Sequence, residues 1–181
     1  MTGRIVYVMG PSGAGKDTLL EFARARLSGS RVVFAHRYIT RPAGAGGENH
    51  VHLSHEEFGA RADLGLFALQ WSSHGLRYGI GIEIETWMDR GVTVVVSGSR
   101  ENAGEAAARY PTLTAVHIDA RPDVLAARLT ARGRESIDDV RARLARRVPF
   151  ALPPHVALTK IDNSGAIDEA GQALLEVLTT A

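Results

Sequence analysis

Short runs of aliphatic and β-branched residues alternate along the chain with segments in which apolar residues recur every three or four positions. The apolar runs predict strands at residues 4–9, 32–36, 92–97, 114–119 and 156–161. The helical spacing predicts helices at residues 15–27, 55–63, 82–90, 101–110, 123–132 and 137–148, and a last one from residue 167. Strands that alternate with helices in this way indicate an α/β fold, in which a parallel sheet carries helices on both faces.

One stretch departs from this alternation. Residues 66–71 and 76–81 are extended segments joined by "SSHG" at 72–75, which predicts a β-hairpin inserted into the plan. Ser54 and Glu57 have the spacing of a capping box for the helix at 55–63. No low-complexity linker or internal repeat divides the chain, so we expect residues 1–181 to form a single domain.

The composition excludes several classes of protein. The formal net charge is only +1 over 181 residues, which argues against a protein that coats nucleic acid. There are no cysteines, so disulfides, thiolate metal sites and cysteine nucleophiles are excluded. No apolar segment approaches membrane-spanning length, and the apolar start at residues 5–10 is too short for a signal sequence. We therefore expect a cytoplasmic protein without nucleic-acid or membrane partners.

The strongest motif is "GPSGAGKD" at residues 10–17, between the first predicted strand and the first predicted helix. A strand that enters G-x-x-x-x-G-K and leaves into a helix is the context of a phosphate-binding loop, where backbone N–H groups and the helix N-terminus hold the phosphates of ATP. An ordinary glycine-rich turn would need neither the full spacing nor the lysine. The motif predicts an ATP site formed by Gly10, Pro11, Ser12, Gly13, Ala14, Gly15, Lys16, Asp17 and Thr18.

The residue after the lysine breaks the pattern, because Asp17 stands where a serine or threonine normally holds magnesium. An acidic residue in the first turn of a helix is favoured by the helix dipole alone. A carboxylate beside a triphosphate is repelled, however, unless a cation lies between them, and Mg²⁺ prefers such oxygen ligands. Thr18 is a poor substitute, because one step along a helix rotates the side chain by about 100°. Asp17 is therefore the predicted Mg²⁺ ligand.

Beyond this loop, the chain resembles the guanylate kinase family of P-loop kinases. The resemblance is carried by "YITRP" at 38–42, "SHEEF" at 54–58, "LQW" and "GLRYG" at 69–71 and 75–79, and "RLTARGRESIDDVRARL" at 128–144. It implies a P-loop NTPase fold of the guanylate kinase type, with an acceptor-binding region at about 36–82 and an arginine-rich lid at about 130–148. It also implies that Arg132 and Arg143 act in catalysis with Lys16, and that Asn163 lies beside the adenine. On spacing alone, Arg143 with Asp139 would be part of a solvated helix face.

Four positions depart from the guanylate kinase pattern. Gly44 stands in place of a second acceptor-phosphate arginine, Gln70 replaces the glutamate that reads guanine, and Ser97 and Ser99 replace aspartates at the end of a strand. Guanine presents N–H groups that favour carboxylate acceptors, and losing such hydrogen bonds costs about 1.5–3 kcal/mol each. GMP is therefore a poor candidate for the acceptor.

This set of departures is similar to the ribose 1,5-bisphosphate phosphokinase family, whose enzymes act in phosphonate catabolism. The matching motifs are "GPSGAGKD" at 10–17, "HRYITR" at 36–41, "ENH" at 48–50 and "GSR" at 98–100. The resemblance implies an ATP-dependent phosphotransferase that uses Mg²⁺ and a small phosphorylated sugar. Its expected reaction moves the γ-phosphoryl group of ATP to the 1-phosphate of ribose 1,5-bisphosphate and yields ADP and 5-phosphoribosyl 1-diphosphate.

The expected acceptor-binding residues come from the same motifs and their surroundings. Arg41 is covered by the family motif, whereas Arg37 could be only a surface charge, and Arg100 could bind the 5-phosphate or simply begin a helix. Tyr78 could bind an acceptor phosphate, although a tyrosine in an apolar run often packs in the core instead. The neutral side chains of Gln70, Ser97 and Ser99 suit the hydroxyl groups of a sugar. The full set is Arg37, Arg41, Glu48, Gln70, Tyr78, Ser97, Ser99 and Arg100.

Other interpretations remain open from the sequence. The chain could be a guanylate kinase, a P-loop kinase for another small molecule, or a catalytically inactive guanylate-kinase-like binding module. Inactive modules tend to lose the loop lysine and the lid arginines, which this chain keeps. We interpret Trp71 and Trp87 as core residues, and His36, His50 and His52 as incidental or substrate-contacting rather than a metal site. The oligomeric state is open, a homodimer included.

Overall fold

The computed structural model of the chain describes residues 3–44, 50–131 and 150–180. It contains two compact units, one formed by residues 1–6 and 29–97 and the other by residues 7–28 and 98–181. Strand β1 (Arg4–Met9) contributes to both, and its residues from Ile5 to Met9 are at most 1 % exposed. Such complete burial is expected for a strand inside a parallel sheet that is covered on both faces.

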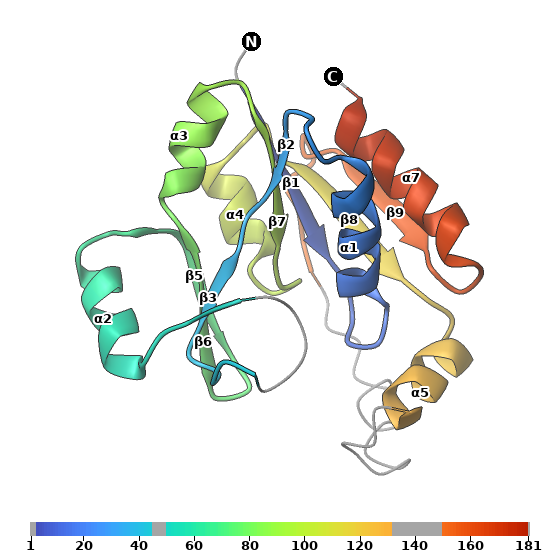
Figure 1. Ribbon diagram of the computed structural model, residues 1–181, viewed down its shortest axis with the longest axis horizontal. Helices are drawn as coiled ribbons and strands as arrows, with labels where there is room; N and C mark the ends of the chain where they lie inside the picture. The colour runs from blue at the N-terminus through green and yellow to red at the C-terminus, as the bar shows by residue number, and fades with distance from the viewer. Residues whose placement is uncertain (1–2, 45–49, 132–149, 181) are drawn as a thin grey trace. The chain divides into compact units, whose positions relative to one another are not determined.

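The main sheet is parallel wherever its pairing is described. Strand β2 (Val32–Phe34) pairs with β7 (Thr93–Ser97), and β8 (Thr114–Asp119) pairs with β9 (Leu158–Asp162). The order of the five strands is β2-β7-β1-β8-β9 (Figure 1). The predicted α/β fold with a parallel sheet is confirmed.

In the second unit, helices α1 (Lys16–Arg26) and α7 (Ile167–Thr179) lie side by side (Figure 1). They approach closely because Gly171 has no side chain where the ring of Phe22 lies, and a Cβ atom there would be 2.3 Å from that ring. Buried Leu174 and Leu178 complete the inner face of α7. The other helices described in this unit are α4 (Ala103–Arg109) and α5 (Pro122–Ala131).

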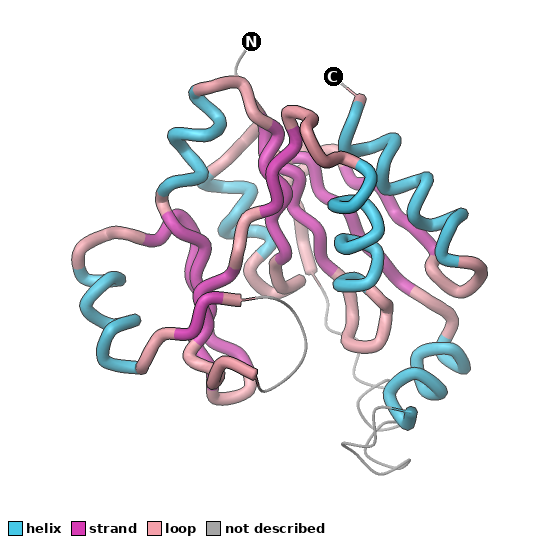
Figure 2. Tube along the Cα trace, viewed as in Figure 1, coloured by secondary structure: helices cyan, strands magenta, loops and turns pink. Residues whose placement is uncertain are grey.

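The first unit contains a second sheet, of order β4-β3-β6-β5. Strands β5 (Phe67–Ser73) and β6 (Leu76–Gly81) form the predicted hairpin and run side by side in Figure 2. Its turn places His74 and Gly75 at φ 50° and 74°, the left-handed pair that suits the twist of a two-residue hairpin loop. Helices α2 (His55–Asp63) and α3 (Glu83–Asp89) belong to the same unit. The Ser54 hydroxyl accepts a hydrogen bond from the Glu57 N–H at 3.0 Å, which is the N-cap half of the predicted capping box, while the Glu57 carboxylate pairs with Arg61 at 2.7 Å.

Two expectations were wrong. The strand predicted at 32–36 ends at Phe34, and the chain continues into β3 (Arg37–Ile39) in the other sheet, where β4 (Val51–His52) joins it. Trp71 and Trp87 are only half-buried rather than core, and the Trp71 ring stacks on its cross-strand neighbour Tyr78. The helix predicted at 137–148 lies outside the described residues.

Candidate functional site

The predicted phosphate loop lies between β1 and α1 and depends on its glycines. Gly13 and Gly15 have φ angles of 89° and 80°, the left-handed region that other residues rarely adopt. Gly10 lies so close to β8 that an added Cβ atom would be 2.1 Å from the carbonyl oxygen of Ile118. Helix α1 then begins at Lys16. The loop is therefore shaped to present backbone N–H groups at a helix N-terminus, the arrangement that binds phosphate.

Two side chains from outside the motif support this loop through hydrogen bonds to backbone carbonyl oxygens. The Asn163 amide donates to the carbonyl oxygen of Ala14 at 2.7 Å and is only 4 % exposed. Arg128, on α5, donates to the carbonyl oxygens of Asn163 at 2.9 Å and of Ala14 at 3.4 Å. The structure thus places Asn163 at the predicted ATP site as a support of the loop backbone. Arg128 was not among the site residues predicted from the sequence, since its contact with Ala14 joins residues that are far apart along the chain.

Lys16 and Asp17 form an ion pair within the loop. The Lys16 ammonium lies 3.0 Å from a carboxylate oxygen of Asp17, and the two side chains are 14 % and 48 % exposed. The lysine is therefore held by the protein, whereas the carboxylate faces partly outward. Among the described residues, no group of three or more histidine, aspartate or glutamate side chains could enclose a metal ion. Mg²⁺ in kinases takes one or two carboxylates together with substrate phosphates, so a single aspartate at this place fits.

The predicted residues after β7 have structural partners. The Ser99 hydroxyl accepts from the N–H of Asn102, and the Ser99 carbonyl accepts from the Tyr7 hydroxyl at 2.8 Å. A hydroxyl that accepts one bond can still donate another, so Ser99 keeps a proton for a ligand. Ser97, at the end of β7 in the first unit, is 8 % exposed.

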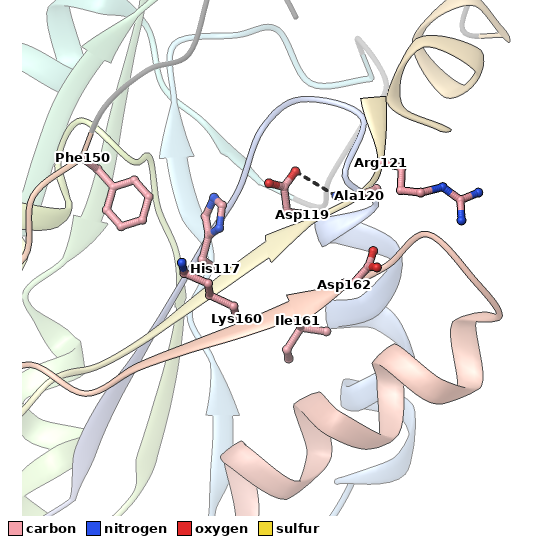
Figure 3. A pocket seen from close by; sticks show the side chains of 8 residues that line it. All are labelled: His117, Asp119, Ala120, Arg121, Phe150, Lys160, Ile161 and Asp162. Atoms are coloured by element: carbon pink, nitrogen blue, oxygen red, sulfur yellow. Dashed lines mark hydrogen bonds between the residues drawn. The ribbon is translucent and has the colours of Figure 1, made fainter. Parts of the chain in front are cut away.

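A cavity of about 340 Å³ lies at the carboxyl ends of β8 and β9 (Figure 3). The register pairs His117 with Lys160, and the Phe150 ring lies 5.1 Å from the His117 ring. Burial lowers the pKa of His117; the Asp119 carboxylate opposes this, and the charges of Arg100 and Lys160 add to it. None of the described residues that line the cavity was among the site residues predicted from the sequence. They are His117, Asp119, Ala120, Arg121, Phe150, Lys160, Ile161 and Asp162.

In the first unit, the hairpin register decides which predicted residues share a face. Tyr78 pairs with both Ile39 and Trp71, and paired residues point to the same side of a sheet. The Trp71 and Tyr78 rings stack 5.5 Å apart, and the Arg37 guanidinium lies 5.2 Å from the centre of the Tyr78 ring. We call this side, with Arg37, Ile39, Trp71 and Tyr78, the Tyr78 face. A guanidinium that stacks on an aromatic ring in this way is held in a fixed orientation on this face.

Gln70 lies on the opposite face. It pairs with Gly79, which also pairs with Tyr38, and this side of the sheet packs on α2. The register shift between Phe67 and Leu69 determines which residues of β5 point to each face of the sheet. The structure therefore brings Arg37 and Tyr78 together and separates Gln70 from them.

Arg41, just after β3, contacts two histidines. His50 Nδ1 lies 3.3 Å from the Arg41 guanidinium, and His50 Nε2 lies 3.0 Å from the Arg41 carbonyl oxygen. His52 Nδ1 lies 2.9 Å from the same oxygen. Three other predicted site residues, Glu48, Arg132 and Arg143, lie outside the described residues.

Comparison with known proteins identifies close relatives, although no family model matches the chain. It is 60 % identical to the ribose 1,5-bisphosphate phosphokinase PhnN of Burkholderia pseudomallei, over 97 % of this chain and 95 % of that protein. It is 55 % identical to PhnN of Chromobacterium violaceum over 98 % and 94 % of the two chains. For PhnN of Thiobacillus denitrificans the identity is 52 %, over 99 % and 94 %.

Among solved structures, guanylate kinase from Anaplasma phagocytophilum superposes with a TM-score of 0.70 at 18 % identity, over 98 % of this chain and 85 % of that one. At this identity the likeness concerns the fold alone, and it confirms the expected guanylate kinase type of fold. The helices that the structure describes include none with the length and apolar character needed to cross a membrane.

Proposed function

Because this chain belongs to the ribose 1,5-bisphosphate phosphokinase family, we propose that it transfers the γ-phosphoryl group of ATP to the 1-phosphate of ribose 1,5-bisphosphate. An oxygen of the 1-phosphate forms a new bond to the γ-phosphorus, and the bond from that phosphorus to the β,γ-bridging oxygen breaks. The products are ADP and 5-phosphoribosyl 1-diphosphate. The observation that carries this proposal is a complete phosphate loop in a chain 60 % identical to such an enzyme over nearly its whole length.

The reaction requires two polyanions to be held in line, and it needs no general base because a phosphate oxygen is already a nucleophile. The N–H groups of residues 13–16 bind the β- and γ-phosphates, and the Lys16 ammonium neutralises charge on the transferring group. Asn163 and Arg128 keep the loop in this shape through the Ala14 carbonyl. Asp17 would hold Mg²⁺, which would supply positive charge to neutralise the phosphates.

The acceptor binds through arginines and hydroxyl groups. Arg37 and Arg41 bind phosphate oxygens of the acceptor, and Tyr78, next to Arg37 on the Tyr78 face, donates its hydroxyl proton. In the second unit, Ser99 and Arg100 contact the sugar and its 5-phosphate. Arg132 and Arg143 act as lid arginines on the transferring phosphoryl group. Gln70, on the other face of its sheet, is the weakest of the predicted contacts.

ADP release from Mg·ATP with a panel of acceptors tests this proposal. The panel contains ribose 1,5-bisphosphate, GMP, AMP, gluconate and ribose 5-phosphate, with ³¹P NMR to identify the product. We expect turnover with the bisphosphate alone and formation of 5-phosphoribosyl 1-diphosphate. Turnover with GMP would contradict the argument from Gln70, Ser97 and Ser99. No turnover with any acceptor of the panel, with ATP still bound, would favour an acceptor outside the panel or the binding-module interpretation.

The assignment of Asp17 leads to a separate expectation. Asp17→Asn removes the charge that attracts Mg²⁺, so the Mg²⁺ concentration for half-maximal rate should rise roughly 10–100-fold. Thr18→Ala is the matched control, because Thr18 is the neighbouring exposed hydroxyl. It should change this concentration by less than about twofold. Magnesium titrations of both variants, with calorimetry of ATP binding at each Mg²⁺ level, provide the comparison. Equal effects of the two substitutions would remove Asp17 as the metal ligand.

A further inference from the structure

The two histidines around Arg41 occupy defined hydrogen-bonding roles. A carbonyl oxygen can only accept, so His50 Nε2 and His52 Nδ1, at 3.0 and 2.9 Å from the Arg41 oxygen, must both carry protons. A guanidinium can only donate, so His50 Nδ1 must accept from Arg41 Nη2. His50 meets both demands only as a neutral ring with its proton on Nε2.

The local fold explains why the Arg41 carbonyl needs these partners. Strand β4 pairs with β3 in parallel through Ile39 and His52, and the last described bond of this ladder runs from the Leu53 N–H to the Ile39 carbonyl. Arg41 lies beyond that point, where the described strands supply no donor to its carbonyl oxygen. His50 and His52 are two positions apart, so in an extended segment their side chains point the same way. Both reach the Arg41 oxygen.

His52 pairs with Ile39, and Ile39 pairs with Tyr78, so these residues are on the Tyr78 face. The histidines thus connect Arg41 to the face that carries Arg37. The Arg41 Nε atom is buried and finds no hydrogen-bond partner in the described part of the chain. A buried unpaired guanidinium N–H is unfavourable, and an anion on that edge would satisfy it.

We propose that His50 is a positioning residue that fixes the direction of the Arg41 guanidinium toward an acceptor phosphate, while His52 fixes the Arg41 backbone. This inference rests on the proposed function, since it takes Arg41 as a ligand of the acceptor. Nδ1 of His50 holds one N–H of Nη2, and the remaining N–H groups of the fork are left to bind phosphate oxygens in a bidentate manner.

The two contacts of His50 can be separated by substitution. In His50→Asn the amide oxygen can replace Nδ1 as acceptor for Arg41, whereas in His50→Gln the amide N–H can replace Nε2 as donor to the carbonyl. We expect His50→Ala and His50→Gln to raise the KM for the acceptor about tenfold. The kcat and the KM for ATP should change by less than about twofold, and His50→Asn should keep the acceptor KM within about threefold. His55→Ala, at an exposed histidine on α2, is the matched control and should leave all three constants unchanged.

A double-mutant cycle excludes a merely structural role. If His50 acts through Arg41, then His50→Gln should cause no further increase of the acceptor KM in an Arg41→Ala background. An additional increase there, or equal effects of His50→Asn and His50→Ala, would overturn the proposal.

A readout independent of turnover separates this proposal from the proposed function. In protein labelled with ¹⁵N in the histidine rings, NMR should show a neutral His50 with an unprotonated Nδ1, whose chemical shift changes in Arg41→Ala. A wild type that is inactive with ribose 1,5-bisphosphate would refute the proposed function, and the NMR result would still decide the Arg41–His50 contact. A protonated Nδ1, or a shift unaffected by Arg41→Ala, would overturn that contact.

Discussion

Lys16→Ala is expected to lower kcat at least roughly 10³-fold while the protein stays folded. The ammonium is the one lysine charge of the phosphate loop, and removing a single preorganised group that stabilises transition-state charge costs about 10²–10³ in kcat. The loss of kcat should reach or exceed the upper end of this range, because Asp17 then lacks its ion-pair partner. Its carboxylate then repels the phosphates that the lysine attracted. Stopped-flow ADP release and circular dichroism of the variant provide the measurement.

The chain supplies its own control for this experiment. Lys160 is the other of its two lysines, and it lies exposed on β9 at the cavity beside His117. Lys160→Ala removes the same charge from the same chain without touching the phosphate loop, so kcat should stay within about twofold of the wild type. Near-normal turnover of Lys16→Ala would show that the loop is not part of the catalytic site. A large loss of kcat in Lys160→Ala would indicate that the cavity takes part in catalysis instead.

The phosphate loop could be predicted from sequence because its information is local. The spacing of Gly10, Gly15 and Lys16 between an apolar strand and a helix encodes the backbone path without reference to distant residues. Arg128 could not be predicted, because its contact with Ala14 joins residues 114 positions apart and depends on how α5 packs. Motifs that act through their own backbone are therefore visible in a single sequence, whereas the side chains that support them are not.

The acceptor side was less predictable for a different reason. Strands β3 and β4 have three and two residues, too few to show the alternation that identifies a strand. The sides taken by Gln70 and Tyr78 depend on the irregularity between Phe67 and Leu69, and one added residue exchanges the two faces of a strand. A resemblance can suggest which residues matter, but it does not fix this register.

The second large effect is expected at Gly15. It has a φ of 80°, and a Cβ atom there would be 2.5 Å from the Asn163 amide nitrogen and 3.5 Å from the Arg128 guanidinium. Gly15→Ala should therefore displace Asn163 from the Ala14 carbonyl and turn the loop N–H groups away from the phosphates. We expect ATP affinity to fall about 100-fold, as two charge-assisted contacts to the nucleotide are lost. Calorimetry of ATP binding measures this.

Gly29→Ala is the matched control, because Gly29 has nearly the same φ, 78°, but nothing lies within 4 Å of its added Cβ atom. Both variants carry the strain of a left-handed alanine, about 1–2 kcal/mol in the free energy of unfolding. Only Gly15→Ala adds the collision, so only it should lose ATP binding. If the collision acts through Asn163, then Asn163→Ala should weaken ATP binding in the wild type and cause little further loss in Gly15→Ala. Additive losses would mean that Asn163 contacts the nucleotide itself, as the resemblance implies, and that its bond to the loop is secondary.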